Sequence, residues 1–536
     1  MKDYTKRQKI LIVLGVSLFI LIGSGLTYAA LTWATNPINI GLTSGCFEIN
    51  YTPGGAINNA NVEVMNESTL INGSKFTITD GIALTYANIG IKSTCTIEGY
   101  GSLYLNVTNL SSAFTTGSSK GSLKYAILNN TSSSTTLTVA GLKGQSFDIV
   151  KTGTITSTGT VNILTKQLSN TSQNKYLIVF YIDGSKIGND VIGASFNGNI
   201  SADAHQGKAP YEGLAKLIAN DTFKSTKTVT LNNVNYKYDD THKLMEDVAG
   251  NIRYYGASPN NYIYFNCSDY KNQTSSTCET WRIIGVFDGK VKIMRGSIIG
   301  TYSWDNKNTD TGAETAYGKN DWNTARLMKL LNPNNYYTID SNDNGYGQSL
   351  YWDAQSGICF SGQDNAITSC NFTSTGLKND ITRNMIAETT YYTRGHNSSS
   401  VYVDAMYDKE RLSGTVVNAT PPRTLTWTGK VAIPYPSDYG YAADLSLCQK
   451  QLGSYNDVTC TANNWMKSIL ASNYGWLLTP ESGYENAAWR VSSSGSVYYS
   501  GIAYLAYGVL PVLSLIPELD IGSGSGTSSS PYQLSV

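Results

Sequence analysis

Residues 475–514 read GWLLTPESGYENAAWRVSSSGSVYYSGIAYLAYGVLPVLS, and this stretch decides the fold predicted for the second half of the chain. An apolar run, Trp476–Leu478, ends in a Thr-Pro turn. A hairpin follows, in which a strand with Trp489 leads through the polar turn Ser492–Gly495 into a tyrosine-rich strand. A last apolar strand, Tyr507–Leu515, is interrupted by a proline. The pattern predicts the closing sheet of a compact, aromatic-rich domain.

The composition indicates an exported, β-rich protein. The chain has 536 residues, room for two or three domains, and charged residues make up only 15% of it. It contains 50 glycines and 38 tyrosines. Low charge with many uncharged polar residues is more typical of a surface protein than of a cytosolic enzyme. The formal net charge is zero, so we expect no nucleic-acid partner.

The cysteines indicate an oxidising compartment. The chain contains eight: Cys46, Cys95, Cys267, Cys278, Cys359, Cys370, Cys448 and Cys460. Counting alone leaves many pairings open, but the last six form three close couples that each close a short loop, which leaves the first two for each other. Unpaired buried thiols are the alternative. Zinc binding is disfavoured, because there is no Cys-x-x-Cys and no histidine at ligand spacing from a couple. Disulfides place the chain outside the cytoplasm.

The N-terminal residues predict a membrane anchor. Residues 1–9 form a basic cytoplasmic flank, and residues 10–34 are mostly apolar. A helix of about 20 apolar residues crosses a bilayer, and the basic flank keeps the N-terminus inside. We therefore expect a single-pass protein of the cell membrane with the bulk of the chain outside. A cleavable signal peptide is the alternative, since Tyr28–Ala30 provides small residues for cleavage.

Residues 36–205 are predicted to form an all-β sandwich. Short alternating runs recur between turns rich in Gly, Asn and Ser. Tyr176–Ile182 presents alternate apolar side chains on one face. No catalytic group is evident there, so we interpret this part as a stalk. Residues 206–243 are predicted to form a linker with a short helix near 210–220.

This part resembles a known class. The segments TYAALTWA (27–34), GCFEINYT (45–52) and KYLIVFYIDGSKIGNDVIGASFNGNISADA (175–204) resemble the camelysin and biofilm-matrix proteins of Gram-positive bacteria. The resemblance implies a jelly-roll-like sandwich behind an export segment. It does not bring metalloprotease activity, because the chain has no His–Glu zinc motif.

Residues 244–536 are predicted to form an α+β domain. A hairpin is expected around the Asp288–Gly289 turn, with Trp281 and Ile283 before it. Helices are predicted at 322–331 with Asn323 as N-cap, at 380–389 and at 464–471.

Motifs for catalysis are weak in this domain. His396 is its only histidine and lies in a polar loop, and no G-x-S-x-G elbow occurs. Calcium is the best candidate for a bound metal. Asp340, Asn342 and Asn344 place oxygen ligands at alternate positions before a glycine, although Tyr351 stands where an EF-hand has glutamate. The polar-loop interpretation of these residues is the stronger one.

Aromatic rings beside amide and charged groups are the more suggestive feature. Flat rings of this kind suit sugar rings or peptide chains. We take Tyr439, Tyr441, Trp489 and Arg490 as the candidate ligand-binding residues. The alternative is that most of the aromatic residues form the core.

The second half also resembles a known family. WRIIGVFDGKVKIMR (281–295), NDWNTARLMKLLN (320–332), KVAIPYPSDYGYAA (430–443) and YGVLPVLSL (507–515) resemble, in this order, an uncharacterised family of exported domains of Gram-positive gut bacteria. The last block is similar to the end of the C-type-lectin-like fold of formylglycine-generating enzymes. Leu510 replaces the arginine of that pattern, and no unpaired cysteine is expected nearby, so the oxidase activity is not carried over.

These observations predict an extracellular binding or adhesion protein. A sandwich stalk would present a C-type-lectin-like domain to a glycan, or to a protein of a host or cell surface. Two alternatives stay open. One is an enzyme, either a formylglycine-type oxidase or a carbohydrate-active hydrolase. The other is a structural subunit of a surface layer or fibre.

Overall fold

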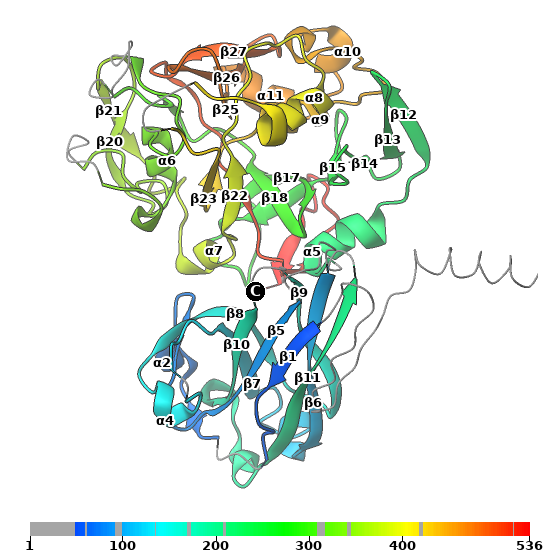
Figure 1. The fold of residues 1–536 in the computed structure, drawn as a ribbon, viewed down its shortest axis with the longest axis vertical. Coiled ribbons are helices and arrows are strands. Elements are labelled where there is room, and N and C mark those ends of the chain that lie inside the picture. Colours follow the sequence, from blue (N-terminus) through cyan, green and yellow to red (C-terminus); the bar gives the residue numbers. More distant parts are fainter. Residues whose placement is uncertain are drawn as a thin grey trace, which may run out of the picture. The chain divides into compact units, whose positions relative to one another are not determined.

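The computed structural model describes residues 49–58, 62–91, 99–134, 136–168, 173–206, 211–307, 317–339, 345–417, 422–517 and 519–535. The chain divides into two compact units, Met1–Pro210 and Tyr211–Val536 (Figure 1). The predicted anchor, the predicted pair Cys46–Cys95 and the candidate calcium ligands Asp340, Asn342 and Asn344 lie outside the described residues. No helix in the described ranges is both long and apolar enough to cross a membrane.

The first unit is a β-sandwich-like arrangement of two antiparallel sheets (Figure 1). The larger sheet has the order β1 (Ile49–Pro53), β5 (Ala83–Ile91), β10 (Asn174–Asp183), β7 (Leu123–Asn129), β8 (Ser146–Thr154), β4 (Lys75–Thr77) and β3 (Ile71–Asn72), with β2 (Val64–Met65) parallel to β10. The smaller sheet has the order β11 (Phe196–Gln206), β6 (Gly99–Leu110) and β9 (Gly159–Leu168). Short helices connect the strands: α2 (Glu67–Leu70), α3 (Ser112–Thr115) and α4 (Val139–Leu142).

Strand β10 is central because both of its faces are buried. Tyr176, Ile178 and Phe180 belong to the core that lies between the two sheets. Leu177 and Val179 belong to a second core on the other face, which also contains residues of α2 and α4. A strand covered on both faces reads as a continuous apolar run, as the YLIVFYI segment of β10 does.

The second unit is built on one long sheet. Its order is β12 (Lys227–Leu231), β13 (Val234–Asp239), β14 (Leu244–Glu246), β15 (Ile252–Tyr254), β17 (Glu279–Phe287), β18 (Lys290–Arg295), β29 (Val512–Ser514) and β24 (Val431–Ala432), with β16 (Tyr262–Phe265) paired to β17. Residues 211–243, interpreted from the sequence as part of a linker, are therefore placed within this unit, because β13 pairs with β14. Within these residues, α5 (Gly213–Lys216) and the π-helical turn Leu217–Thr222 precede β12.

The hairpin predicted at Asp288–Gly289 is confirmed as β17 and β18. Both turn residues have positive φ, 48° and 76°, which is the backbone that a two-residue hairpin turn requires and which a glycine adopts readily. The sheet is buried on both faces. Trp281 and Ile283 enter one core, while Ile284 enters another.

The opening stretch, residues 475–514, divides among three sheets. Strands β25 (Trp476–Pro480), β26 (Ala487–Val491) and β27 (Val497–Ile502) form a sheet of their own, with the predicted turn between β26 and β27. Strand β29 instead enters the long sheet between β18 and β24. The prediction of a single closing sheet was therefore wrong, because Pro511 lies between β28 (Tyr507–Gly508) and β29 and the chain passes from one sheet to the other.

The three predicted helices are shorter than expected. The first, α6 (Arg326–Leu331), begins after an Asp321 turn whose carboxylate accepts from the Asn323 backbone, so Asn323 is not its N-cap. The second, α7 (Asp380–Asn384), ends early because β22 (Thr389–Tyr392) pairs with β23 (Thr426–Gly429). The third is α11 (Lys467–Leu470), followed by the 3₁₀ turn Ala471–Asn473.

The remaining elements cover the long sheet or lie at its margins. Helices not predicted from the sequence are α8 (Val403–Asp408) with its π-helical continuation Lys409–Ser413, α9 (Pro436–Tyr441) and α10 (Val458–Thr461). Hairpins pair β20 (Ser356–Phe360) with β21 (Ile367–Asn371) and β30 (Asp520–Ser523) with β31 (Gln533–Ser535), while β19 (Thr301–Tyr302) pairs with β28 from far along the chain.

Three of the four predicted disulfides are present. They join Cys267 to Cys278, Cys359 to Cys370 and Cys448 to Cys460. Each closes a loop of 11 or 12 residues, so each bond constrains the unfolded chain only locally. The three bonds all lie in the second unit.

Candidate functional site

Three of the four predicted ligand-binding residues are buried. Tyr439 and Tyr441 lie on α9 and are 0% and 1% exposed, and Trp489 on β26 is 0% exposed. The Tyr439 hydroxyl donates to the Gly495 carbonyl at 3.0 Å, and the Trp489 indole donates to the His396 carbonyl at 2.9 Å. The Tyr441 hydroxyl is buried without a hydrogen-bond partner among the described residues. All three rings are core side chains, so they do not form the exposed binding face that the sequence predicted.

Arg490 is the predicted residue that stays partly exposed. Successive side chains of a strand point to opposite faces, so burial of Trp489 directs Arg490 outward. Its guanidinium carbon lies 5.3 Å from the ring centre of Tyr474, 5.6 Å from that of Tyr498 and 5.3 Å from that of Tyr507. We name these four residues the Arg490 surface.

The Arg490 surface brings together residues from four short segments. Tyr498 faces Arg490 across the β26–β27 pair, Tyr507 belongs to β28, and Tyr474 ends the 3₁₀ turn before β25. Gly501 leaves room for the arginine, because a Cβ at Gly501 would lie 3.0 Å from the Arg490 Cδ. The small residue on β27 is thus part of how this surface is built.

Tyr474 has an unusual backbone conformation. Its φ and ψ are 51° and 52°, a left-handed conformation that costs an L-residue about 1–2 kcal/mol. Its ring is nevertheless 42% exposed and stacks on Tyr507 at 5.6 Å, and its hydroxyl accepts a hydrogen bond from Ser493. Backbone strain of this kind is concentrated at functional sites, and here it holds an exposed ring beside a cation.

The Arg490 guanidinium has capacity for further hydrogen bonds. Its Nε and Nη1 have no hydrogen-bond partner among the described residues, nor does a described carboxylate form an ion pair with it. Unpaired guanidinium nitrogens can donate to a carbonyl, hydroxyl or carboxylate of a ligand, although Nε and Nη1 are themselves buried in this structure. Exposed rings next to it, with Tyr498 38% exposed, offer flat apolar faces for the same ligand.

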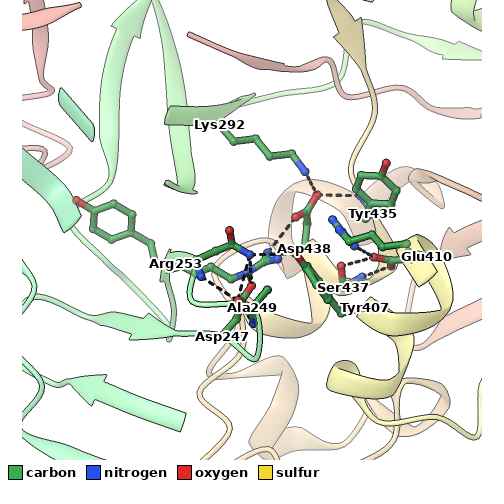
Figure 2. Close-up of polar contacts among 12 residues, drawn as sticks. Asp247, Ala249, Arg253, Lys292, Tyr407, Glu410, Tyr435, Ser437 and Asp438 are labelled. Atoms are coloured by element: carbon green, nitrogen blue, oxygen red, sulfur yellow. Dashed lines mark hydrogen bonds and ion pairs between the residues drawn. The ribbon is translucent and has the colours of Figure 1, made fainter. Parts of the chain in front are cut away.

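A network of buried charged side chains surrounds α9 (Figure 2). Asp438 accepts hydrogen bonds from Arg253 at 3.0 Å, from Lys292 and from the Tyr435 backbone at 3.0 Å. Arg253 also donates to Asp247 at 2.5 Å. We name these charges, together with Glu410 and Arg411, the Asp438 network.

The rest of the Asp438 network closes on itself. Asp247 also accepts from the backbone of Ala249 and Asn251, and Glu410 accepts from the backbone and hydroxyl of Ser437 and pairs with Arg411 (Figure 2). Three carboxylates and three cations therefore compensate one another in the core. Buried ion pairs need this level of satisfaction to offset their desolvation.

The network shifts the pKa values of Asp438 and Lys292. Burial by itself would raise the pKa of Asp438, but Lys292 and Arg253 outweigh it and lower that pKa to about 2. Burial lowers the pKa of Lys292 to about 8, against the opposing effect of Asp438. Asp438 is also the third residue of α9 and belongs to its capping box, because its carboxylate accepts from the backbone of the N-cap residue, Tyr435. Because Tyr439 on α9 bonds the β26–β27 turn at Gly495, the network indirectly supports the hairpin that carries Arg490.

No group of three or more His, Cys, Asp or Glu residues within the described ranges is arranged to hold a metal ion. Asp305 is a buried residue, 1% exposed. Its carboxylate accepts from the Lys319 backbone at 2.8 Å, which is a structural role. Leu510, at the position where the formylglycine-generating pattern has arginine, is fully buried in the core.

No protein-family model matches the chain, and no curated protein matches it.

The sequence interpretation missed Tyr474 and Tyr507 of the Arg490 surface. The alternation along β26 and β27 was a usable signal, since a buried tryptophan next to an arginine implies an outward arginine. Tyr474 had no such signal, because the position of its ring depends on its own left-handed backbone conformation. Tyr507 comes from a strand that pairs with distant β19.

Proposed function

We propose that this protein is an extracellular binding protein, anchored in the cell membrane by residues 10–34, whose second unit has a C-type-lectin-like fold and binds a cell-surface or host glycan. The first unit acts as the stalk. The observation that carries the proposal is the Arg490 surface, a cation with free donors among three tyrosine rings, two of which are more than a third exposed.

The chemistry of this surface favours a glycan. The apolar face of a pyranose packs against a tyrosine ring, and its hydroxyl and carboxylate oxygens accept hydrogen bonds from a guanidinium. The strained Tyr474 backbone and the stacked Tyr474–Tyr507 pair supply a rigid ring surface. Rigid rings bind with a small loss of conformational entropy.

A glycan array probed with the full-length protein tests the proposal. Arg490→Gln and Tyr474→Asn, the latter chosen because asparagine tolerates a left-handed backbone, should each weaken binding roughly tenfold, or about 1.4 kcal/mol. Tyr484→Ser is the matched control, since Tyr484 is 66% exposed but belongs to no part of the Arg490 surface. If the protein binds to a panel of surface proteins but to no glycan on the array, the ligand is a protein and not a glycan. Silence in both assays, or equal binding by the variants, would refute the proposal.

A further inference from the structure

A pocket of about 450 Å³ lies in the second unit, and none of the residues of the Arg490 surface lines it. Its walls come from β16, β17, β18 and α11. The residues that matter here are Tyr262, Glu279, Thr280, Arg282, Arg295 and Ile469. We name it the Arg282 pocket.

Arg282 is a buried cation without an anionic partner. It is 7% exposed, its Nε donates to the Asn261 side-chain carbonyl at 2.6 Å, and its Nη2 has no hydrogen-bond partner among the residues that the structure describes. Its guanidinium carbon lies 3.8 Å from the ring centre of Tyr262 and 4.8 Å from that of Trp465. Through the described part of the chain, no carboxylate forms an ion pair with it. An uncompensated buried charge costs several kcal/mol.

The neighbouring arginine shows the contrast. Arg295 donates to both oxygens of Glu279, at 2.9 and 3.2 Å, and Glu279 also accepts from the Trp281 indole. Burial would lower the pKa of Arg295, but Glu279 outweighs this and raises it. Burial lowers the pKa of Arg282 to about 10, and no carboxylate opposes that effect.

The charges that line the pocket define the ligand's charge. Two arginines and one glutamate line it, and Glu279 is taken by Arg295, so one positive charge stays uncompensated. A monoanion neutralises that charge, whereas a dianion would leave a negative charge beside Glu279 in a partly desolvated site. The Tyr262 ring and the Ile469 side chain add apolar lining.

From this geometry we infer that the Arg282 pocket binds a carboxylate carried on a flat apolar group, with the carboxylate on the Arg282 guanidinium and the apolar group against Tyr262 and Ile469. Guanidinium and carboxylate match in a planar, two-bond geometry. This site does not depend on the proposed glycan surface, and either can fail without the other.

Position 280 offers a test that leaves the core intact. Thr280 lines the pocket and its side chain is exposed, so substitutions there are tolerated better than at Arg282. Thr280→Glu adds a negative charge near the expected carboxylate, and Thr280→Gln is its neutral match. Repulsion between the side-chain carboxylate introduced by Thr280→Glu and the carboxylate of the ligand should weaken binding by on the order of fivefold to tenfold.

The experiment measures sodium benzoate binding to the full-length protein by ligand-observed NMR at constant ionic strength, with neutral benzamide and sodium phosphate as comparison probes. We expect saturable benzoate binding, no binding of benzamide, unchanged binding by Thr280→Gln and the stated loss in Thr280→Glu. Arg282→Gln, checked for folding by circular dichroism, should abolish binding. Absence of benzoate binding, or equal binding by both Thr280 variants, would overturn the inference. Tighter binding of phosphate than of benzoate would overturn the carboxylate assignment.

Discussion

Arg253 and Arg490 have similar aromatic surroundings and opposite electrostatic ones. Each guanidinium lies within 6 Å of three ring centres: Phe287, Tyr407 and Tyr441 for Arg253, and Tyr474, Tyr498 and Tyr507 for Arg490. Arg253 is 1% exposed and hydrogen-bonded to two aspartates. Arg490 is partly exposed and has no such partner among the described residues.

The difference between Arg253 and Arg490 shows when an arginine surrounded by aromatic rings indicates a binding site. Ring contacts alone do not identify a binding site, because the core of this protein uses the same contact to bury a charge. The presence or absence of a compensating carboxylate distinguishes the two cases. By this criterion Arg253 is structural, while Arg490 and Arg282 are candidates for a ligand. The following substitutions test that criterion, from the largest expected effect to the smallest.

The largest effect is expected for Asp438→Asn. The substitution leaves Arg253 and Lys292 without their shared carboxylate in the core, and breaking a buried pair costs about 3–5 kcal/mol. Urea unfolding of the full-length protein measures the free energy of unfolding. Asp380→Asn is the control, because Asp380 pairs with Arg383 but its side chain is 82% exposed, and it should have far less effect. Equal effects at the two positions would contradict the structural role of the network.

Acid should weaken the Asp438 network in a defined pH range. The folded state holds the pKa of Asp438 at about 2, below its ordinary 3.8. Its contribution, about 2 kcal/mol, is therefore present above pH 4 and is lost as pH falls through 2. In urea unfolding at several pH values, the stability difference between wild type and Asp438→Asn should narrow below pH 4. A difference that stays constant down to pH 2 would count against the lowered pKa.

Two substitutions of Tyr474 distinguish the effect of its backbone conformation on stability from the effect of its ring. Both Tyr474→Gly and Tyr474→Ala remove the ring, but only glycine adopts φ near 51° without strain. The glycine variant should therefore be more stable than the alanine variant by about 1 kcal/mol, as measured by thermal unfolding. The reverse order would show that the left-handed conformation is not maintained in solution.

The smallest effect on stability is expected for Arg490→Gln. Loss of exposed cation–π contacts costs less than about 1 kcal/mol, and the arginine leaves no partner unpaired. The same substitution at Arg253 should be several times more destabilising, because it leaves Asp247 without a cation and Asp438 with Lys292 alone. Unfolding curves of both variants, recorded together, decide this. A large loss of stability at Arg490 would make it a structural residue as well.

Local patterns were sufficient to predict several parts of the fold. The β17–β18 hairpin was predicted because Asp288–Gly289 specifies its own turn, and the three disulfides of the second unit were predicted because each closes a short loop. The helices were overestimated, because competing hydrogen bonds at Asp321 and the pairing of β22 with β23 end or delay them. Tertiary context overrides propensity at such positions.

The candidate sites depended much more on the tertiary structure. Tyr439, Tyr441 and Trp489 look like binding residues in the sequence, since a ring in the core and a ring on the surface have the same composition around them. Only the fold shows that α9 and β26 bury them. The Asp438 network joins residues up to 185 positions apart, and no local pattern reports such pairs.

The sequence by itself determined the β-rich composition, the central hairpin and the short-range disulfides, because turns and close cysteine couples are properties of neighbouring residues. The tertiary structure alone decided which charges are compensated. Whether an arginine has a carboxylate partner depends on which distant strands and helices pack against it. That packing gives Arg253 two aspartates, while Arg282 and Arg490 have no carboxylate partner among the described residues.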